Sequence, residues 1–127
     1  MTPLATSPAV RRRTAVRSLL LDLAAVVVFA TIGRRSHAEG ITAAGVASTA
    51  WPFAAGTAAG WVASRGWRAP TSVRSTGLPV WASAVVAGML LRRATGEGTA
   101  ASFIVVASVV LGAFLMGWRA LASRRRT

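Results

Sequence analysis

The charged residues of this chain gather in clusters and leave four long, almost uncharged stretches between them. Of its 127 residues, 54% are hydrophobic and only 14% are charged. Stretches of this kind are typical of helices that cross a lipid bilayer, because a charged side chain within the hydrocarbon layer is costly. The pattern therefore predicts an all-α, polytopic membrane protein whose single domain contains four transmembrane helices.

The ends of the apolar stretches set the expected boundaries. The predicted helices span about residues 17–35, 40–64, 77–93 and 98–120, within a transmembrane domain of residues 16–121. The flanking residues 1–15 and 122–127 are rich in arginine and are predicted to be basic cytoplasmic tails, the first of them disordered. Asp22 in the first stretch and Arg34 at its end argue against a cleaved signal peptide.

The arginines also predict the orientation of the helices. The net charge of +12 comes from arginine alone, since the chain has no lysine. Most arginines lie in the two tails and in the loop of residues 65–76, and cytoplasmic segments carry such an excess. We therefore expect a multi-pass protein of the cell membrane with both termini in the cytoplasm. The indoles of Trp61 and Trp118 are expected at the cytoplasmic interface, which tryptophan favours.

The same positive charge indicates which classes of partner the chain is expected to bind. In a soluble protein, so basic a composition would suggest nucleic-acid binding. Here the arginines flank apolar helices, so we expect no nucleic-acid partner. The expected partner is instead a lipid bilayer with anionic headgroups at the arginine-rich cytoplasmic face.

Two short outer turns share a charged frame at a constant offset. The first frame is Arg34, Arg35, Glu39 and Gly40, and the second is Arg92, Arg93, Glu97 and Gly98. With one residue removed, the match continues to Gly60-Trp61 and Gly117-Trp118. One interpretation is a parallel repeat of two tandem helical hairpins, related by an axis along the membrane normal. The alternative is that both turns use arginine and glutamate independently, because each charge suits the helix end beside it.

Several short motifs, taken in order, resemble a known family. They are Asp22, Gly33-Arg34, Ser36-His37, Pro52-Phe53, Gly56, Trp81, Arg92, Phe103 and Gly117-Trp118-Arg119. Over roughly residues 18–119 the chain resembles the small bacterial and archaeal membrane proteins of the DUF 3054 family. The resemblance implies a four-helix membrane protein of unknown biochemical function and supplies no catalytic roles.

Six charged or titratable side chains are candidates for a functional role. They are Asp22, Arg34, His37, Glu39, Arg92 and Arg119. Asp22 lies one turn into the first helix, where an acidic side chain usually has a partner; Arg119, Arg65 and Arg17 are expected at similar depth. Asp22 has two interpretations, a structural ion pair or interfacial anchor, and a proton or cation relay.

His37 is the only histidine, and its pKa near neutrality would suit a proton acceptor. The alternatives are a solvent-exposed outer turn and a hydrogen bond that caps a helix. With no cysteine, one histidine and three acidic residues, the chain has few reactive groups. We therefore expect no enzymatic activity, no catalytic residues, no metal site and no cofactor.

The second apolar stretch contains the residues expected to bend it and to pack it. Pro52 removes a backbone hydrogen bond near the middle of the membrane, and Trp51 beside it could line a cavity or simply fill space. Gly56 and Gly60 have the GxxxG spacing that lets helices approach closely, and Gly112 offers a similar face in the fourth helix. We expect these glycines to pack helices within the monomer or in a dimer.

Two functions remain open from the sequence. The first is a small membrane module with a structural, assembly or lipid-interacting role. The second is a small transporter or channel with Asp22, His37 and Arg34 near the path of a solute or proton. Because four short helices enclose little space, the second function would call for a homo-oligomer.

Overall fold

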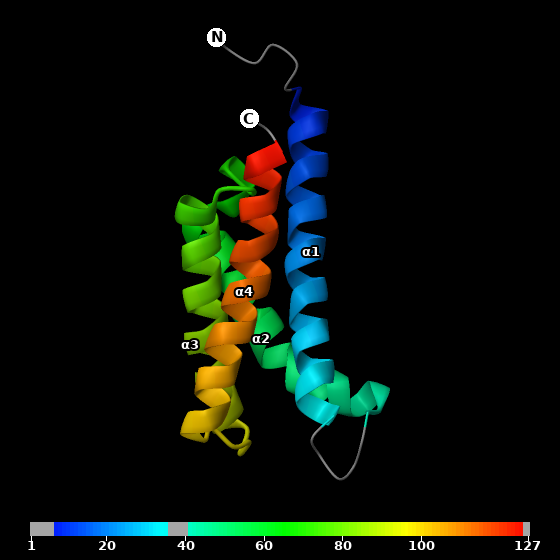
Figure 1. The fold of residues 1–127 in the computed structure, drawn as a ribbon, viewed down its shortest axis with the longest axis vertical. Coiled ribbons are helices and arrows are strands. Elements are labelled where there is room, and N and C mark those ends of the chain that lie inside the picture. The colour runs from blue at the N-terminus through cyan, green and yellow to red at the C-terminus, as the bar shows by residue number, and fades with distance from the viewer. Residues whose placement is uncertain (1–6, 36–40, 126–127) are drawn as a thin grey trace.

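The structure, a computed structural model, describes residues 7–35 and 41–125 (Figure 1). Its four α-helices are α1 (Pro8–Arg35), α2 (Ala43–Ser64), α3 (Leu78–Ala94) and α4 (Ala101–Arg125). A short 3₁₀ helix, η1 (Gly66–Arg68), and a π-helical turn, η2 (Val73–Gly77), connect α2 to α3. The described residues contain no strand, which confirms the all-α prediction.

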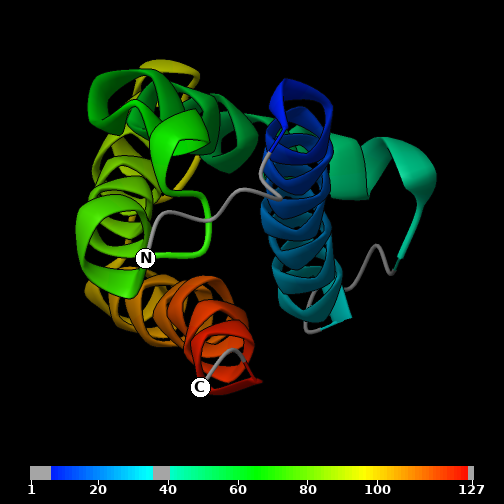
Figure 2. The same cartoon turned by 90° about the horizontal axis from the view of Figure 1, so that it is seen from above.

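Successive helices run in opposite directions. Figure 1 shows α1 and α3 running one way and α2 and α4 the other. The start of α1, the end of α4 and the α2–α3 connection therefore lie together at one end, which we call the terminal end. The opposite end, where α1 and α3 finish, is the turn end. Seen from above, α2 crosses behind α1 at a marked tilt and reaches α3, its closest packing partner (Figure 2).

Both basic tails are more helical than the composition suggests. The first helix begins at Pro8 rather than near residue 17, so the prediction of disorder through residue 15 is wrong from that point on. The Ser7 hydroxyl accepts a hydrogen bond from the amide of Val10 at 3.2 Å and caps the helix. Proline suits the first helical position, and the arginines that follow are good helix formers. At the other end, α4 continues to Arg125.

Within residues 7–35 and 41–125, three segments are long and apolar enough to cross a membrane: Pro8–Arg34, Val73–Ala94 and Ala101–Arg124. The helix α2 has 22 residues but is not one of them, because its glycine, serine, threonine, tryptophan and proline residues lower its hydropathy. The burial pattern is also the reverse of that in a soluble protein. Leucines and valines on every helix are exposed, while Asp22, Thr57 and Arg119 are fully buried. Such a surface suits a lipid environment.

Three phenylalanines pack against one another across α1, α2 and α4. The ring centroid of Phe29 on α1 lies 5.1 Å from that of Phe53 on α2 and 6.0 Å from that of Phe103 on α4. Gly88 on α3 makes room for them, because a Cβ atom there would lie 2.5 Å from the Phe53 ring. We call these three rings the aromatic layer; along α1, Phe29 lies between Asp22 and Arg34.

The glycines of the GxxxG motif lie where α2 crosses α3. A Cβ atom at Gly56 would lie 2.7 Å from the carbonyl oxygen of Ser83, and one at Gly60 would lie 2.8 Å from the Cα atom of Val80. The Ser83 hydroxyl also donates a 2.7 Å hydrogen bond to the carbonyl of Gly56. The two backbones are therefore in direct contact within one chain.

Candidate functional site

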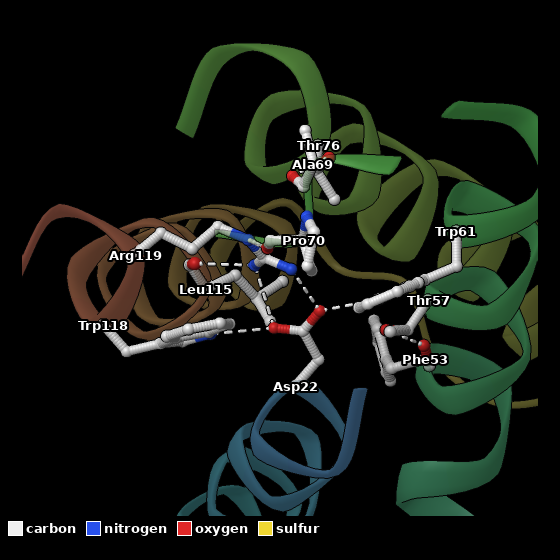
Figure 3. Close-up of polar contacts among 10 residues, drawn as sticks. All are labelled: Asp22, Phe53, Thr57, Trp61, Ala69, Pro70, Thr76, Leu115, Trp118 and Arg119. Atoms are coloured by element: carbon white, nitrogen blue, oxygen red, sulfur yellow. Dashed lines mark hydrogen bonds and ion pairs between the residues drawn. The ribbon is translucent and has the colours of Figure 1, made fainter. Parts of the chain in front are cut away.

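Asp22 lies at the centre of a buried polar cluster near the terminal end (Figure 3). Its carboxylate faces Arg119 of α4, and both side chains are 0% exposed. Arg119 Nη1 donates to Oδ1 at 2.9 Å and Nη2 donates to Oδ2 at 2.7 Å. Two parallel hydrogen bonds of this kind form the strongest geometry for an arginine–carboxylate pair. Of the three partners that the sequence offered for Asp22, the structure selects Arg119.

Two tryptophans provide the remaining hydrogen bonds to the carboxylate. The indole nitrogen of Trp61 donates to Oδ2 of Asp22 at 2.7 Å, and that of Trp118 donates to Oδ1 at 2.9 Å. Each carboxylate oxygen therefore accepts one hydrogen bond from an arginine and one from an indole. These donors take the place of the water molecules that would hydrate an exposed carboxylate, and they therefore offset the cost of burying its charge.

The guanidinium of Arg119 is held on its other edges as well. Its Nε donates to the carbonyl of Pro70 at 2.9 Å, and Nη1 also donates to the carbonyl of Leu115 at 2.9 Å. Its Cζ lies 4.6 Å from the centroid of the Trp118 ring, at the distance of a cation–π contact. We call Asp22, Trp61, Trp118, Arg119 and the Pro70 carbonyl the Asp22 cluster; it joins α1, α2, α4 and the α2–α3 connection.

Helical spacing explains how both charges come to face inward. On α1, Asp22 is four residues before Val26, and both side chains are fully buried. On α4, Arg119 is four residues after Leu115, which is also fully buried. Residues four apart lie on one helix face, so each charge extends the apolar stripe of its helix toward the terminal end.

We expect Trp61→Phe to lower the free energy of unfolding by about 1–2 kcal/mol, because Asp22 loses one buried hydrogen bond while the ring still packs. The measurement is reversible unfolding of the purified protein in detergent. The matched control is Trp67→Phe, since Trp67 is exposed at the same end of the protein. Equal effects of the two substitutions would contradict a structural role for the Trp61 hydrogen bond.

The model of one protein family matches the chain over residues 19–122; its description is "Protein of unknown function (DUF3054)". This chain belongs to the DUF3054 family. The match covers most of the chain and confirms the resemblance inferred from the order of its motifs. No curated protein and no solved structure matches it.

A second polar site of this DUF3054 protein lies at the turn end. A cavity of about 370 Å³ is bordered there by Arg34, Arg92 and Glu97, with Phe29 and Phe103 on its apolar side. The Arg92 Cζ lies 4.3 Å from the Phe103 ring centroid, and its Nε donates to the carbonyl of Gly98 at 3.0 Å. Two arginines that the sequence places at equivalent turns therefore border one cavity.

The remaining predicted residues have separate locations. His37 and Glu39 fall outside the described residues. Pro52 is buried, and α2 continues through it without a break. Trp51 is 45% exposed and lies on the outer surface of α2. Gly112 of α4 faces an indole, because a Cβ atom there would lie 3.1 Å from Nε1 of Trp81.

Sequence reasoning missed the role of the two indoles that bind Asp22. Trp61 is only 6% exposed, so its indole packs inside the bundle near the terminal end and does not lie on the outer surface. One signal was present in the sequence, since Gly60-Trp61 and Gly117-Trp118 are aligned by the internal match. An indole N–H only donates, and a buried carboxylate only accepts, so the two groups satisfy each other.

Proposed function

We propose that this DUF3054 protein is a structural and lipid-interacting module of the cell membrane, with no enzymatic activity and no ion path through Asp22. The observation that carries the proposal is that Asp22 is fully buried and that its hydrogen bonds come from within the protein. Asp22 is 0% exposed, and all four of its hydrogen bonds come from arginine or indole N–H groups. Guanidinium and indole N–H groups are donors only and offer no acceptor to which a proton could pass, so they suit a structural anchor and not a proton relay.

The transporter alternative would need Asp22 and Arg34 to border one polar path. The aromatic layer of Phe29, Phe53 and Phe103 lies between them instead. Asp22 also borders neither the cavity at the turn end nor the cavity beside Arg11 and Arg68 at the terminal end. The geometry therefore favours the structural function over the transport function.

The direction of the helices supports a fourth membrane span. If α1 and α3 cross the membrane in the same direction, α2 must bring the chain back between them (Figure 1). Its low hydropathy fits this position, because Thr57 and Gly60 are buried against other helices and not exposed to lipid. Polar residues in a membrane helix are tolerated when the bundle covers them.

The distribution of arginines supports a cytoplasmic terminal end. Both helix termini at this end are basic, and Arg65, Arg68 and Arg74 lie in the connection between α2 and α3. A cavity of about 630 Å³ lies there, bordered by Arg11 and Arg68. Such a basic surface beside the exposed Trp67 suits the anionic headgroups of the inner leaflet.

Two pairs of residues support the tandem repeat. Trp61 and Trp118, which are aligned by the internal match, donate to the two oxygens of a single carboxylate. Arg34 and Arg92, which are also aligned, border a single cavity. Equivalent residues of two parallel hairpins are expected to meet in this way near a shared axis along the membrane normal.

Single cysteines test both the topology and the closure of the cluster, since the natural chain has none. We expect Ser75→Cys to react with a membrane-impermeant maleimide only from the cytoplasmic side, and Thr95→Cys only from outside. Ser18→Cys, one turn from Asp22 and 2% exposed in the wild type, is expected to react from neither side. The measurement is maleimide labelling in intact cells and in inverted vesicles.

Two results would overturn the proposal separately. Labelling of Ser75→Cys and Thr95→Cys from the same side would contradict the topology of four spans. Rapid labelling of Ser18→Cys from either side would show that water reaches the Asp22 cluster, and would restore the transport function.

A further inference from the structure

We propose that a cleft between α1 and η1 binds an inner-leaflet phospholipid whose headgroup is a phosphomonoester, through the guanidinium groups of Arg11, Arg12 and Arg68. This inference rests on the proposed function, because it takes the terminal end to lie at the cytoplasmic face of a membrane. It goes beyond the general contact of a basic surface with lipid, since it assigns a site and a class of headgroup.

The cleft is formed by one face of α1 and the short helix η1. It has a volume of about 500 Å³ and is bordered by Arg11, Arg12, Ala15 and Val16 of α1 and by Trp67 and Arg68 of η1. Residues three and four apart are neighbours on a helix, so Ala15 lies beside both α1 arginines and nearer the membrane. The part of the cleft nearer the membrane is therefore apolar, and the part farther from it is basic.

The backbones of the two walls are held in place by the packing of the bundle. On one side, α1 continues without interruption from Pro8 to Asp22, which is fully buried. On the other side, η1 begins at Gly66, where an added Cβ atom would lie 2.7 Å from the Trp61 ring. Because η1 packs so closely on an indole of the Asp22 cluster, the two walls keep a fixed separation.

The three guanidinium groups of the cleft are available to a ligand. Within residues 7–35 and 41–125, none of them has a hydrogen-bond, ion-pair or ring partner, in contrast to Arg92 and Arg119. The two acidic residues of the described ranges lie elsewhere, since Asp22 is bound to Arg119 and Glu97 borders the turn-end cavity. The cleft thus carries three positive charges that no described side chain compensates.

A phosphomonoester fits these cations better than a phosphodiester does. A phosphomonoester has three terminal oxygens, all strong acceptors, and a charge of about −1.5 to −2 at pH 7. A phosphodiester headgroup such as phosphatidylglycerol has two such oxygens and a single negative charge. Each guanidinium can donate two parallel hydrogen bonds to phosphate oxygens, so three arginines match the phosphomonoester in both charge and number of acceptors.

The depth of the cleft favours a lipid over a soluble phosphate compound. The first buried residue of α1 is Ser18, and from there to Arg11 the helix rises by about 10 Å. The headgroup region outside a hydrocarbon core of about 30 Å is roughly 5–8 Å thick on each side, so the cleft lies at the level of the headgroups. Trp67 beside it is half exposed, and indoles favour this interface.

The test measures lipid binding to the purified full-length chain by native mass spectrometry, with phosphatidic acid, phosphatidylglycerol and phosphatidylcholine of the same acyl chains in equal amounts. We expect phosphatidic acid to be retained in preference to the other two. Arg11→Gln, Arg12→Gln and Arg68→Gln are each expected to weaken its binding by about tenfold, through loss of charge-assisted hydrogen bonds. The matched controls are Arg13→Gln on α1 and Arg74→Gln on the α2–α3 connection, because both arginines are exposed and neither borders the cleft.

A second pair of variants tests the shape of the cleft without changing its charge. Val16→Trp places an indole in the cleft, whereas Leu20→Trp places one a turn further along α1, at a position that does not border it. Val16 and Leu20 are both exposed, so both variants are expected to unfold at the wild-type temperature. Only Val16→Trp should lower the retention of phosphatidic acid relative to phosphatidylglycerol.

The possible failures have different meanings. If the cleft variants retain phosphatidic acid as the wild type does, or if Arg13→Gln loses as much as Arg12→Gln, the cleft is not the site, while the lipid-interacting function stands. Equal retention of phosphatidylglycerol and phosphatidic acid overturns the headgroup class. Binding of soluble glycerol 3-phosphate as tight as that of phosphatidic acid overturns the assignment to a lipid. If the wild type retains no lipid at all, both this inference and the lipid-interacting function are wrong.

Discussion

Asp22→Ala is expected to lower the free energy of unfolding by about 3–5 kcal/mol, because it leaves the charge of Arg119 buried without its partner. Arg119 is 0% exposed, and its remaining hydrogen bonds go to the neutral carbonyls of Pro70 and Leu115. The loss should appear as a lower midpoint in reversible unfolding of the purified protein in detergent. An exposed control, Arg93→Ala, is expected to change that midpoint very little.

A double-mutant cycle separates the ion pair from its surroundings. Arg119→Met alone is expected to cost about as much as Asp22→Ala, since the carboxylate then stays buried and unpaired. Asp22→Leu combined with Arg119→Met is expected to regain most of this loss, because two apolar residues replace two charges in the same space. Asp22→Asn gives the opposite test. If this variant is as stable as the wild type and only its cellular phenotype is lost, Asp22 has a functional role and the structural assignment is wrong.

The existence of a partner for Asp22 could be predicted from the sequence, whereas its identity could not. An acidic residue inside an apolar helix needs a compensating charge, and only arginines near one end of the bundle are within reach. The selection of Arg119 depends on which face α4 turns toward α1 and on the Pro70 carbonyl, which the α2–α3 connection brings to Nε. Neither the orientation of α4 nor the position of the Pro70 carbonyl can be read from the spacing of residues in the sequence.

The two indoles show why a general preference can hide a specific contact. Tryptophan near the end of a membrane helix usually indicates the interface, and that explanation was sufficient for Trp61 and Trp118. A hydrogen bond from Trp118 to Asp22 could not be foreseen, since the two residues are 96 positions apart in the sequence. Once the helices are packed, the same residues supply half of the hydrogen bonds to the carboxylate.

The start of the first helix and the packing of Gly112 were missed for different physical reasons. Composition describes an average, and the arginine-rich start of the chain suggested disorder although Ser7 and Pro8 form a local helix start. In α4, Gly112 could have closed a helix interface, but it faces Trp81 of α3 instead.

The closed α2–α3 interface leads to the second large effect. Gly56→Ala and Gly60→Ala are each expected to cost about 1–3 kcal/mol, and the double variant more than either, because each added Cβ atom meets the backbone of α3. Those contacts, at 2.7 Å from the Ser83 carbonyl oxygen and 2.8 Å from Val80 Cα, cannot be relieved by a side-chain rotation. The helices must separate, which also pulls Trp61, one residue after Gly60, away from Asp22.

The matched control for these substitutions is Gly117→Ala on α4. Nothing lies within 4 Å of a Cβ atom at Gly117, so the added methyl group meets no neighbour. Because alanine is a better helix former than glycine, this variant is expected to be as stable as the wild type or more stable by up to about 1 kcal/mol. Unfolding in detergent ranks the variants directly. If Gly56→Ala and Gly60→Ala behave like Gly117→Ala, α2 and α3 do not cross in backbone contact, and the Asp22 cluster does not depend on that crossing for the position of its first indole.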